Sequence, residues 1–170
     1  LRSKAQYALI LEDDVSFNAK TLRTLIGKLI QQQQYWDIVG LEVTHRGRPL
    51  TVKALTDKHH VVYYLKKVTH SGAYLINRQA AQKLLRNALP IHMAIDHYFF
   101  RGWEHNIRMV GVEPRVVSQT YGNSDINDGI RMHIFFPRES AKRFSFFSEL
   151  HNLKTRYQWA KHNLILWLNR

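Results

Sequence analysis

The sequence contains no cysteine, which excludes disulfide bonds and thiolate zinc sites. It has no apolar run approaching the roughly 20 residues that a helix needs to cross a bilayer. The short apolar run near the start ends in acids, unlike a secretory signal. We therefore expect a chain that does not span a membrane, and its 170 residues, 45% hydrophobic, are enough for the core of about one domain.

Acidic residues are also scarce. Asp and Glu number 13 against 25 Lys and Arg, for a net charge of +12. Such a surface favours polyanions, namely nucleic acid, anionic lipid headgroups or a phosphorylated glycolipid. About half of the excess lies in residues 129–170, which carry eight Lys or Arg and two acids. No recognised nucleic-acid-binding motif is present, so nucleic acid is not expected as the partner.

Three of the few acids are consecutive. The apolar run Tyr7–Leu11 leads directly into Glu12, Asp13 and Asp14. A continuous short apolar run is typical of a strand buried on both faces in a parallel sheet, and ligands collect at the carboxyl ends of such strands. Side chains alternate along a strand, so Glu12 and Asp14 share one side. We predict a Mg²⁺ or Mn²⁺ site that holds a phosphorylated substrate; the alternative is an acidic loop capping the next helix.

The chain beyond the acids alternates between helical and strand patterns. Ser16 or Asn18 can cap a helix with the apolar face Leu22, Leu25, Ile26, Leu29 and Ile30, and a strand at 38–41 completes a βαβ unit. Further elements are expected in this order: a hairpin or long loop at 44–67, a strand at 72–76, a helix at 78–87 capped by Asn77 with the apolar face Ala80, Ala81, Leu84, Leu85 and Ala88, and a strand at 109–112.

Two further stretches hold candidate functional side chains. Asp96 lies among apolar and aromatic residues, which indicates either the first turn of a helix or a partly desolvated functional carboxylate. The stretch 118–125 is rich in turn-forming and hydrogen-bonding residues, which suits a ligand-contacting loop or an ordinary solvated one.

The tail from 140 to 170 predicts one long amphipathic helix. Its apolar stripe recurs at steps of three and four: Phe146, Leu150, Leu153, Tyr157, Ala160, Leu164 and Trp167. One interpretation is that the stripe docks on the body or on another copy of the chain. The other places the helix in a membrane interface, with Trp159 and Trp167 at headgroup level and cations against anionic lipid.

Four blocks in order resemble glycosyltransferase family 25, the lipooligosaccharide galactosyltransferase family. They are Leu11–Val15 after an apolar strand, Gly72–Asn77 with its Ala-rich helix, Pro90 followed by Ile95–Asp96, and Pro114 followed by Gln119 and Ser124–Ile126. The resemblance implies an α/β, GT-A-like (Rossmann-like) fold, with a mixed sheet flanked by helices and a C-terminal amphipathic helix. It also implies transfer of galactose from UDP-galactose, with inversion, onto a lipooligosaccharide acceptor. We expect a catalytic region at 1–128 and a basic helical tail at 129–170.

The resemblance also implies roles for particular residues. Glu12, Asp13 and Asp14 would hold Mn²⁺ or Mg²⁺, with Asp14 the principal ligand. Asp96 is the expected base for the acceptor hydroxyl, and Asp125 is the competing candidate. Tyr74, Gln119 and Ser124 would contact the sugar or nucleotide, although each is also an ordinary loop or core residue type.

Family members carry a further βαβ segment before the acid-bearing strand, whereas few residues precede Tyr7 here. We therefore expect an N-terminally truncated catalytic region in which half of the donor site is missing. The expected location is cytoplasmic, with a peripheral position on the inner face of a bacterial inner membrane if the tail binds anionic lipid. Whether the chain forms an oligomer is left open.

Two other classes of protein fit the same features. A metal-dependent phosphoryl-transfer enzyme or nuclease also needs clustered carboxylates and a basic surface. A basic module that binds polyanions needs only the surface, and its binding would weaken steeply with salt.

Overall fold

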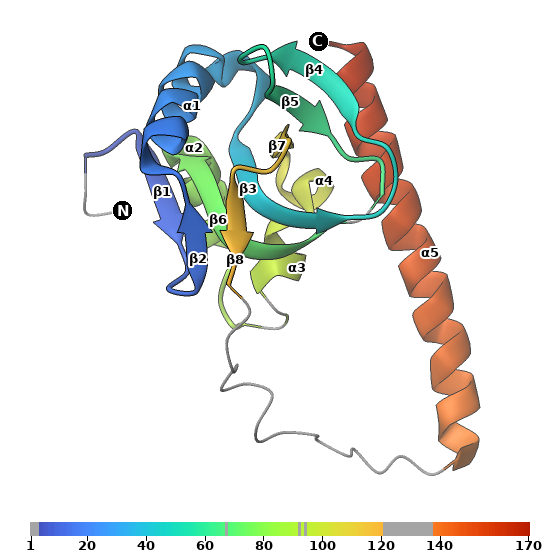
Figure 1. Ribbon diagram of the computed structural model, residues 1–170. Helices are drawn as coiled ribbons and strands as arrows, with labels where there is room; N and C mark the ends of the chain where they lie inside the picture. Colours follow the sequence, from blue (N-terminus) through green and yellow to red (C-terminus); the bar gives the residue numbers. More distant parts are fainter. Residues whose placement is uncertain (1–3, 67, 92, 94, 121–137) are drawn as a thin grey trace.

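The computed structural model describes residues 4–66, 68–91, 93, 95–120 and 138–170, with side chains of the last helix described from residue 151 onward (Figure 1). The elements in chain order are β1 (Tyr7–Leu11), β2 (Val15–Phe17), α1 (Ala19–Gln31), a 3₁₀ turn (Gln33–Tyr35), β3 (Ile38–His45), β4 (Leu50–Ala54), β5 (His60–Tyr63), β6 (Val68–Asn77), α2 (Arg78–Arg86), α3 (Ile95–Phe99), α4 (Gly102–His105), β7 (Met109–Glu113), β8 (Val117–Gln119) and α5 (Arg138–Leu168).

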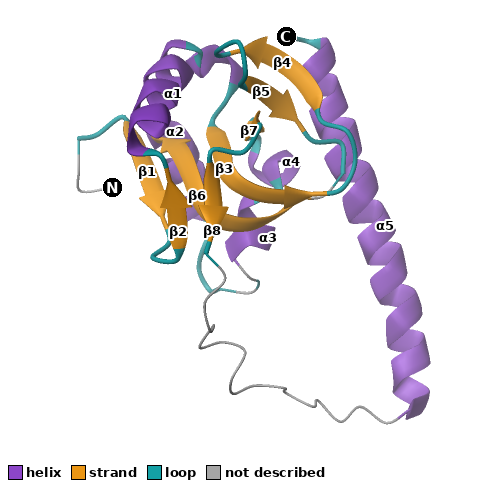
Figure 2. Ribbon diagram, in the orientation of Figure 1, coloured by secondary structure: helices purple, strands orange, loops and turns teal. Residues whose placement is uncertain are grey.

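Six of the strands form one mixed sheet in the order β1-β6-β3-β7-β5-β4. Only β3 and β7 pair in parallel; the other neighbours are antiparallel. β2 and β8 form a separate antiparallel ribbon. Helices flank the sheet and a long helix ends the chain (Figure 2). The predicted mixed α/β fold with a C-terminal helix is therefore confirmed, whereas the GT-A-like assignment and the division at residue 128 stay predictions.

The first strand differs from its prediction. β1 pairs only with β6, antiparallel, with Tyr7 opposite Asn77, so it is an edge strand of the described sheet. Its Leu9 is 38% exposed. The expectation of a strand buried on both faces in a parallel sheet is wrong, because an apolar run alone does not report how many neighbours a strand has. The predicted strand, helix and strand do form as β1, α1 and β3, but β6 lies between the two strands.

The core consists of two apolar clusters on opposite faces of the sheet. Side chains alternate along β3, so Val39 joins the cluster with Leu25 and Leu29 of α1, whereas Ile38 joins the cluster that includes Leu84 of α2. Both predicted helix caps are confirmed. Asn18 Oδ1 accepts from Thr21 N at 2.9 Å and Asn77 Oδ1 accepts from Ala80 N at 2.7 Å.

Other sequence expectations need small corrections. The hairpin expected within 44–67 is β4 and β5, which pair from Leu50–Tyr63 to Ala54–His60. Ile30 and Leu85, assigned to buried helix faces, are 36% and 58% exposed. Both lie at the margin of a helical stripe, where a step of one residue turns the side chain toward solvent.

A buried ion pair joins the start of β3 to the start of β7. Asp37, 5% exposed, accepts hydrogen bonds from Arg108 N at 2.8 Å, Arg108 Nε at 3.0 Å, Arg108 Nη2 at 2.9 Å and Asn77 Nδ2 at 3.1 Å. Burial by itself would raise the pKa of Asp37, but the hydrogen bonds from Arg108 and Asn77 outweigh it and lower that pKa. The pair therefore stabilises the end of the sheet remote from the acidic turn.

The C-terminal helix packs on the body through a face that overlaps the predicted stripe only in part: Trp167 of the stripe packs against the core, whereas other stripe residues do not. Trp159 is 3% exposed and donates through Nε1 to Tyr64 O at 2.6 Å, and Asn163 Nδ2 donates to the same oxygen at 2.8 Å. Leu153, Tyr157 and Leu164 of the predicted stripe are 58%, 62% and 42% exposed, so their predicted burial is wrong. The stripe missed the docking face because that face includes a polar residue, which apolar spacing cannot reveal.

Docking of this helix on the body is thus confirmed, and the placement of Trp159 and Trp167 at lipid headgroups is wrong, since Trp167 Nε1 donates to Thr51 O at 3.0 Å. Phe146 and Leu150 lie outside the described side chains. None of the helices in the described part of the chain is long and apolar enough to cross a bilayer.

Candidate active site

The three consecutive acids form the tight turn that connects β1 to β2. Glu12 N donates to Gly72 O at 2.8 Å, which continues the pairing with β6 to the end of the strand. Glu12 and Asp13 are exposed and Asp14 is half-buried. The prediction that the acids follow the strand is confirmed, but two of the three side chains point into solvent.

Asp14 is fixed by the last strand of the body. β2 pairs with β8 so that Val15 lies opposite Gln119. Gln119 Nε2 donates to Asp14 Oδ2 at 2.6 Å, and Thr120 donates to Asp14 O through its N–H at 2.7 Å and its hydroxyl at 2.5 Å. Asp14 Oδ1 is buried and has no hydrogen-bond partner among the described residues. One predicted site residue, Gln119, thus orients another, Asp14.

A fourth carboxylate, which the sequence reasoning missed, lies beside this turn. Glu42 of β3 is 2% exposed, at an irregularity in the pairing of β3 with β6. A Cβ added to Gly72 would lie 3.1 Å from Glu42 Oε2 and 3.3 Å from Val15 Cγ1, so Glu42 reaches the residues that flank the acids. Glu42 resembles Glu12 in one readable respect, since each directly follows a short apolar run in the sequence.

The negative charge of the Glu42 carboxylate is only weakly compensated by neighbouring positive charges and hydrogen-bond donors. His70 Nδ1 and Arg115 Nη1 each lie 3.8 Å from Glu42 Oε1, beyond hydrogen-bond distance. Glu42 Oε2 has no partner among the described residues. A buried carboxylate oxygen without a donor is costly, and in proteins it commonly marks a bound ion, water or ligand.

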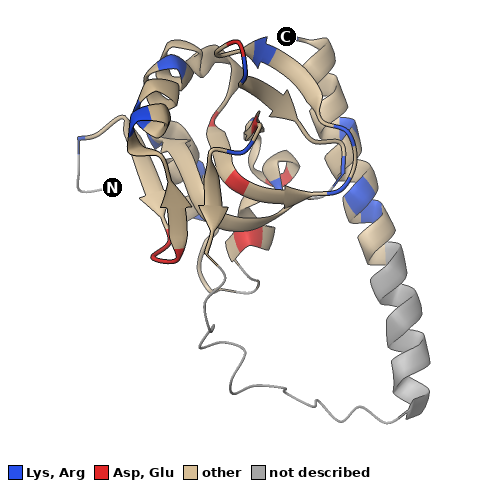
Figure 3. Cartoon of the chain, viewed as in Figure 1, with Lys and Arg blue, Asp and Glu red and all other residues tan. Residues whose placement is uncertain are grey.

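Tyr74 lies between the acidic turn and α3, the helix that carries Asp96. The Tyr74 ring meets Phe99 of α3 edge-on at 5.0 Å. Burial raises the pKa of Tyr74, and the negative charge of Glu12 raises it further. Asp96 lies in the first turn of α3, where its Oδ1 accepts from His97 N at 2.7 Å. Figure 3 shows α3 and the acidic turn toward the same end of the sheet.

The remaining predicted site residues lie outside the part of the chain that the structure describes. These are Asp125, the second candidate base, and Ser124, a predicted contact for the sugar or nucleotide.

The donor chemistry at the turn fits a hard divalent cation. Among the described residues no three His, Asp or Glu side chains converge as a metal-binding group. Asp14 Oδ1 and Glu42 Oε2, however, are buried oxygens without a partner, and carboxylate oxygens are the ligands that Mg²⁺ and Mn²⁺ prefer.

Carboxylates at the edge of a mixed α/β sheet do not by themselves define an activity, because one fold hosts many functions. A family model supplies the class of protein. Glycosyltransferase family 25 (LPS biosynthesis protein) matches residues 1–99, more than half of the sequence, and the chain belongs to this family. No curated protein matches the chain.

Membership of this family supports the conclusion that the protein is a glycosyltransferase of lipopolysaccharide biosynthesis. The resemblance to family 25 identified from the sequence is thereby confirmed. Such an enzyme requires a sugar donor and a lipopolysaccharide acceptor. The matched range contains the acidic turn, Glu42, Tyr74 and Asp96, whereas Gln119 lies beyond it.

Proposed function

We propose that the protein transfers galactose from UDP-galactose onto a lipooligosaccharide acceptor, with inversion at the anomeric carbon. The observation that carries the proposal is the pair of buried, unpartnered carboxylate oxygens on Asp14 and Glu42 beside the acidic turn. Family membership supports sugar transfer over phosphoryl transfer or polyanion binding as the use of these acids.

Asp14 would be the principal ligand of a bound Mn²⁺ or Mg²⁺, with Glu12 or Asp13 and Glu42 as the further candidate ligands. The ion would supply positive charge against the negative charge that grows on UDP as the glycosidic bond breaks. Gln119 keeps the Asp14 carboxylate in one orientation through its 2.6 Å hydrogen bond.

Asp96 accepts the proton of the attacking acceptor hydroxyl, as inversion requires a base in hydrogen-bond reach of that oxygen. Support comes from the contact of α3 with Tyr74, which ties the helix bearing Asp96 to the strand beside the acidic turn. Asp125 remains the competing base. Tyr74, Gln119 and Ser124 contact the donor sugar or nucleotide.

Calorimetry of UDP binding to the full-length protein with and without Mn²⁺ tests the donor site. We expect Asp14→Asn to remove the metal-dependent part of binding, because the amide keeps the size of the side chain and loses its charge. Asp57→Asn, in the exposed turn between β4 and β5, is the matched control and should bind normally. Metal-dependent binding retained in Asp14→Asn would place the ion elsewhere.

The base is tested by transfer kinetics. Asp96→Asn should bind donor normally and transfer at least ~10²-fold more slowly. A rate equal to that of the unmodified protein would transfer the role to Asp125.

The outer face of α5 is a candidate contact for an anionic membrane surface. Leu164, Ile165 and Leu168 are 42%, 45% and 65% exposed, and Lys154 and Lys161 on the same helix are exposed cations. Leu164→Gln with Leu168→Gln should reduce co-sedimentation with vesicles containing anionic lipid, whereas Leu85→Gln, equally exposed on α2, should not. Equal sedimentation of all variants would exclude this contact and with it the inner-membrane location.

A further inference from the structure

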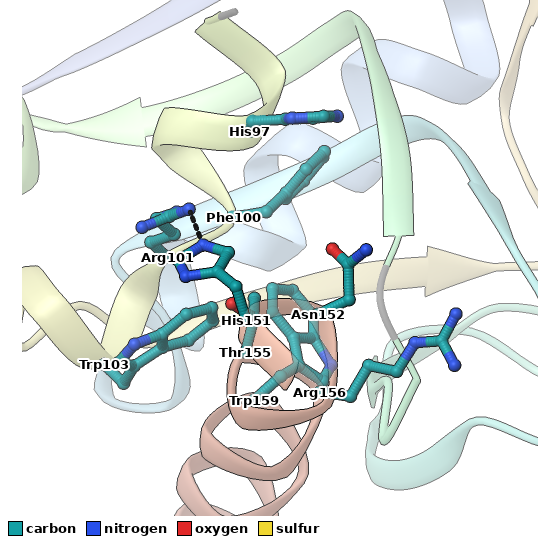
Figure 4. Close-up of a pocket in the computed structure, with 9 residues that line it drawn as sticks. All are labelled: His97, Phe100, Arg101, Trp103, His151, Asn152, Thr155, Arg156 and Trp159. Atoms are coloured by element: carbon teal, nitrogen blue, oxygen red, sulfur yellow. Dashed lines mark hydrogen bonds between the residues drawn. The ribbon is translucent and has the colours of Figure 1, made fainter. Parts of the chain in front are cut away.

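A cavity of about 370 Å³ lies between α5 and the α3–α4 segment, outside the acidic turn (Figure 4). Its volume is within the range of small-molecule sites in proteins. It is lined by three aromatic rings and by cationic or hydrogen-bonding side chains. None of the residues that line this cavity belongs to the candidate donor site described above.

The apolar wall of the cavity consists of Phe100, Trp103 and Trp159. Trp159 meets Phe100 edge-on with ring centroids 6.1 Å apart, and meets Trp103 edge-on at 5.8 Å. Phe100 and Trp159 are each 3% exposed, whereas Trp103 is half-buried. Trp103 is therefore the ring that a ligand can reach, and its contact with buried Trp159 fixes it in place, which suits the C–H face of a sugar ring.

The polar wall carries two arginines, one of them ion-paired with Glu104. Arg101 and Arg156 lie on opposite sides of Trp159 in Figure 4, and the described residues that line the cavity include no Asp or Glu. Arg101 pairs with Glu104 at 2.9 Å and donates to His151 Nε2 at 3.5 Å, which keeps its guanidinium at the rim. Arg156 is exposed and has no ion pair with a described residue. Arginine forks bind phosphate oxygens in pairs.

The two walls are held together by the docking of α5. Trp159 and Asn163 both donate to Tyr64 O, and His162 Nε2 donates to Ile107 O at 3.1 Å. The cavity is thus shaped before any ligand arrives, which reduces the entropic cost of binding.

The cavity also adjoins the candidate base. His97, at its edge, follows Asp96 directly in α3. We propose that the cavity binds a phosphorylated sugar unit of the acceptor, with the ring on the aromatic wall and the phosphate at Arg156. The assignment to the acceptor rests on the proposed function; the phosphorylated-sugar chemistry rests on the cavity alone.

Glucose 6-phosphate, glucose, inorganic phosphate and UDP are the probes, each titrated calorimetrically into the full-length protein. We expect glucose 6-phosphate to bind at least ~10-fold more tightly than glucose or inorganic phosphate, because only it engages both walls. Equal binding of glucose 6-phosphate and glucose, or of glucose 6-phosphate and phosphate, would overturn the proposal.

Two variants and a matched control locate the binding. Arg156→Gln should weaken the binding of glucose 6-phosphate about tenfold. Trp103→Leu should make glucose 6-phosphate bind no more tightly than inorganic phosphate. Lys154→Gln removes an exposed cation from the same helix, outside the cavity lining, and should have no effect. Equal losses in Lys154→Gln and Arg156→Gln would show a diffuse charge effect and refute the site.

The titration with UDP distinguishes a phosphate of the acceptor from the diphosphate of the donor as the group that binds in the cavity. We expect UDP binding to be unchanged in Arg156→Gln, since the donor diphosphate belongs at Asp14. Loss of UDP binding in Arg156→Gln would assign the cavity to the donor and overturn its role for the acceptor. If glucose 6-phosphate binds as expected while UDP does not bind at all with Mn²⁺, the cavity stands and the proposed donor site fails.

Discussion

Glu42 and Asp37 offer a direct test of whether the acidic turn is built for ligand binding or for stability. Both are carboxylates on or next to β3, with 2% and 5% exposure. Conversion to the amide makes the same chemical change at two equally buried places. The expected results are opposite because the two carboxylates have different partners.

In Asp37→Asn the new NH₂ group faces either Arg108 N and Nε or Arg108 Nη2 and Asn77 Nδ2, so two hydrogen bonds are lost in either orientation. Bonds to a charged group contribute roughly 1.5–3 kcal/mol each. Arg108 is 37% exposed and partly rehydrates, which offsets some of this. We expect a loss of about 3 kcal/mol in the free energy of unfolding.

In Glu42→Gln a buried charge is removed, and Oε2 had no hydrogen bond to lose within the described structure. The attraction of Arg115 at 3.8 Å is screened, because that side chain is 49% exposed. Release of the desolvation penalty, several kcal/mol per ion, offsets the lost attraction. We expect stability to change by less than about 1 kcal/mol, while metal-dependent UDP binding weakens about 10-fold or more.

Urea unfolding followed by circular dichroism measures both variants, and calorimetry measures UDP binding. A loss above about 2 kcal/mol in Glu42→Gln would show that the carboxylate is structural. Normal metal-dependent UDP binding in the same variant would remove Glu42 from the donor site.

Further predictions concern pH and the last helix. The pKa of Asp37 is lowered by folding, so its contribution to stability is present above the unfolded value near 4 and is lost as pH falls through the lower folded value. The stability difference between the unmodified protein and Asp37→Asn should therefore shrink below about pH 4; a difference independent of pH would contradict the ion pair. Trp159→Ala should cost about 3–5 kcal/mol by thermal unfolding, whereas Tyr157→Ala, at 62% exposure, should cost under about 0.5 kcal/mol. Equal losses would mean that α5 packs through the face predicted from apolar spacing.

Local signals in the sequence were sufficient for most elements of the fold. Asn18 and Asn77 act as the caps expected of them, because a cap depends on a residue type at a helix start. The status of β1 as an edge strand was not predictable, since it depends on which strand pairs with which. Much of the docking face of α5 was missed for a related reason: the burial of Asn163 is explained only by its hydrogen bond to the carbonyl oxygen of Tyr64, far away in sequence, to which Asn163 Nδ2 donates.

For the candidate site as well, the sequence predicted some residues but not the contacts between them. Glu12, Asp13 and Asp14 stand out because three acids end an apolar run, and family resemblance singled out Gln119 and Asp96. Neither signal shows that Gln119 bonds Asp14, a contact that the pairing of β2 with β8 creates. Glu42 lacks an acidic neighbour in sequence, so its place beside the turn is visible only in the structure, where a Cβ on Gly72 would lie 3.1 Å from Glu42 Oε2 and 3.3 Å from Val15 Cγ1.

The bond between Gln119 and Asp14 spans 105 positions of the chain. The ribbon that supports it, β2 with β8, has three residue pairs and stands apart from the six-stranded sheet. A short ribbon opens at lower free energy than the sheet it borders. Asp14 can take this orientation only after Gln119 has been synthesised, and we expect the orientation to be lost at a lower denaturant concentration than the sheet, so that donor binding fails while the sheet is still folded.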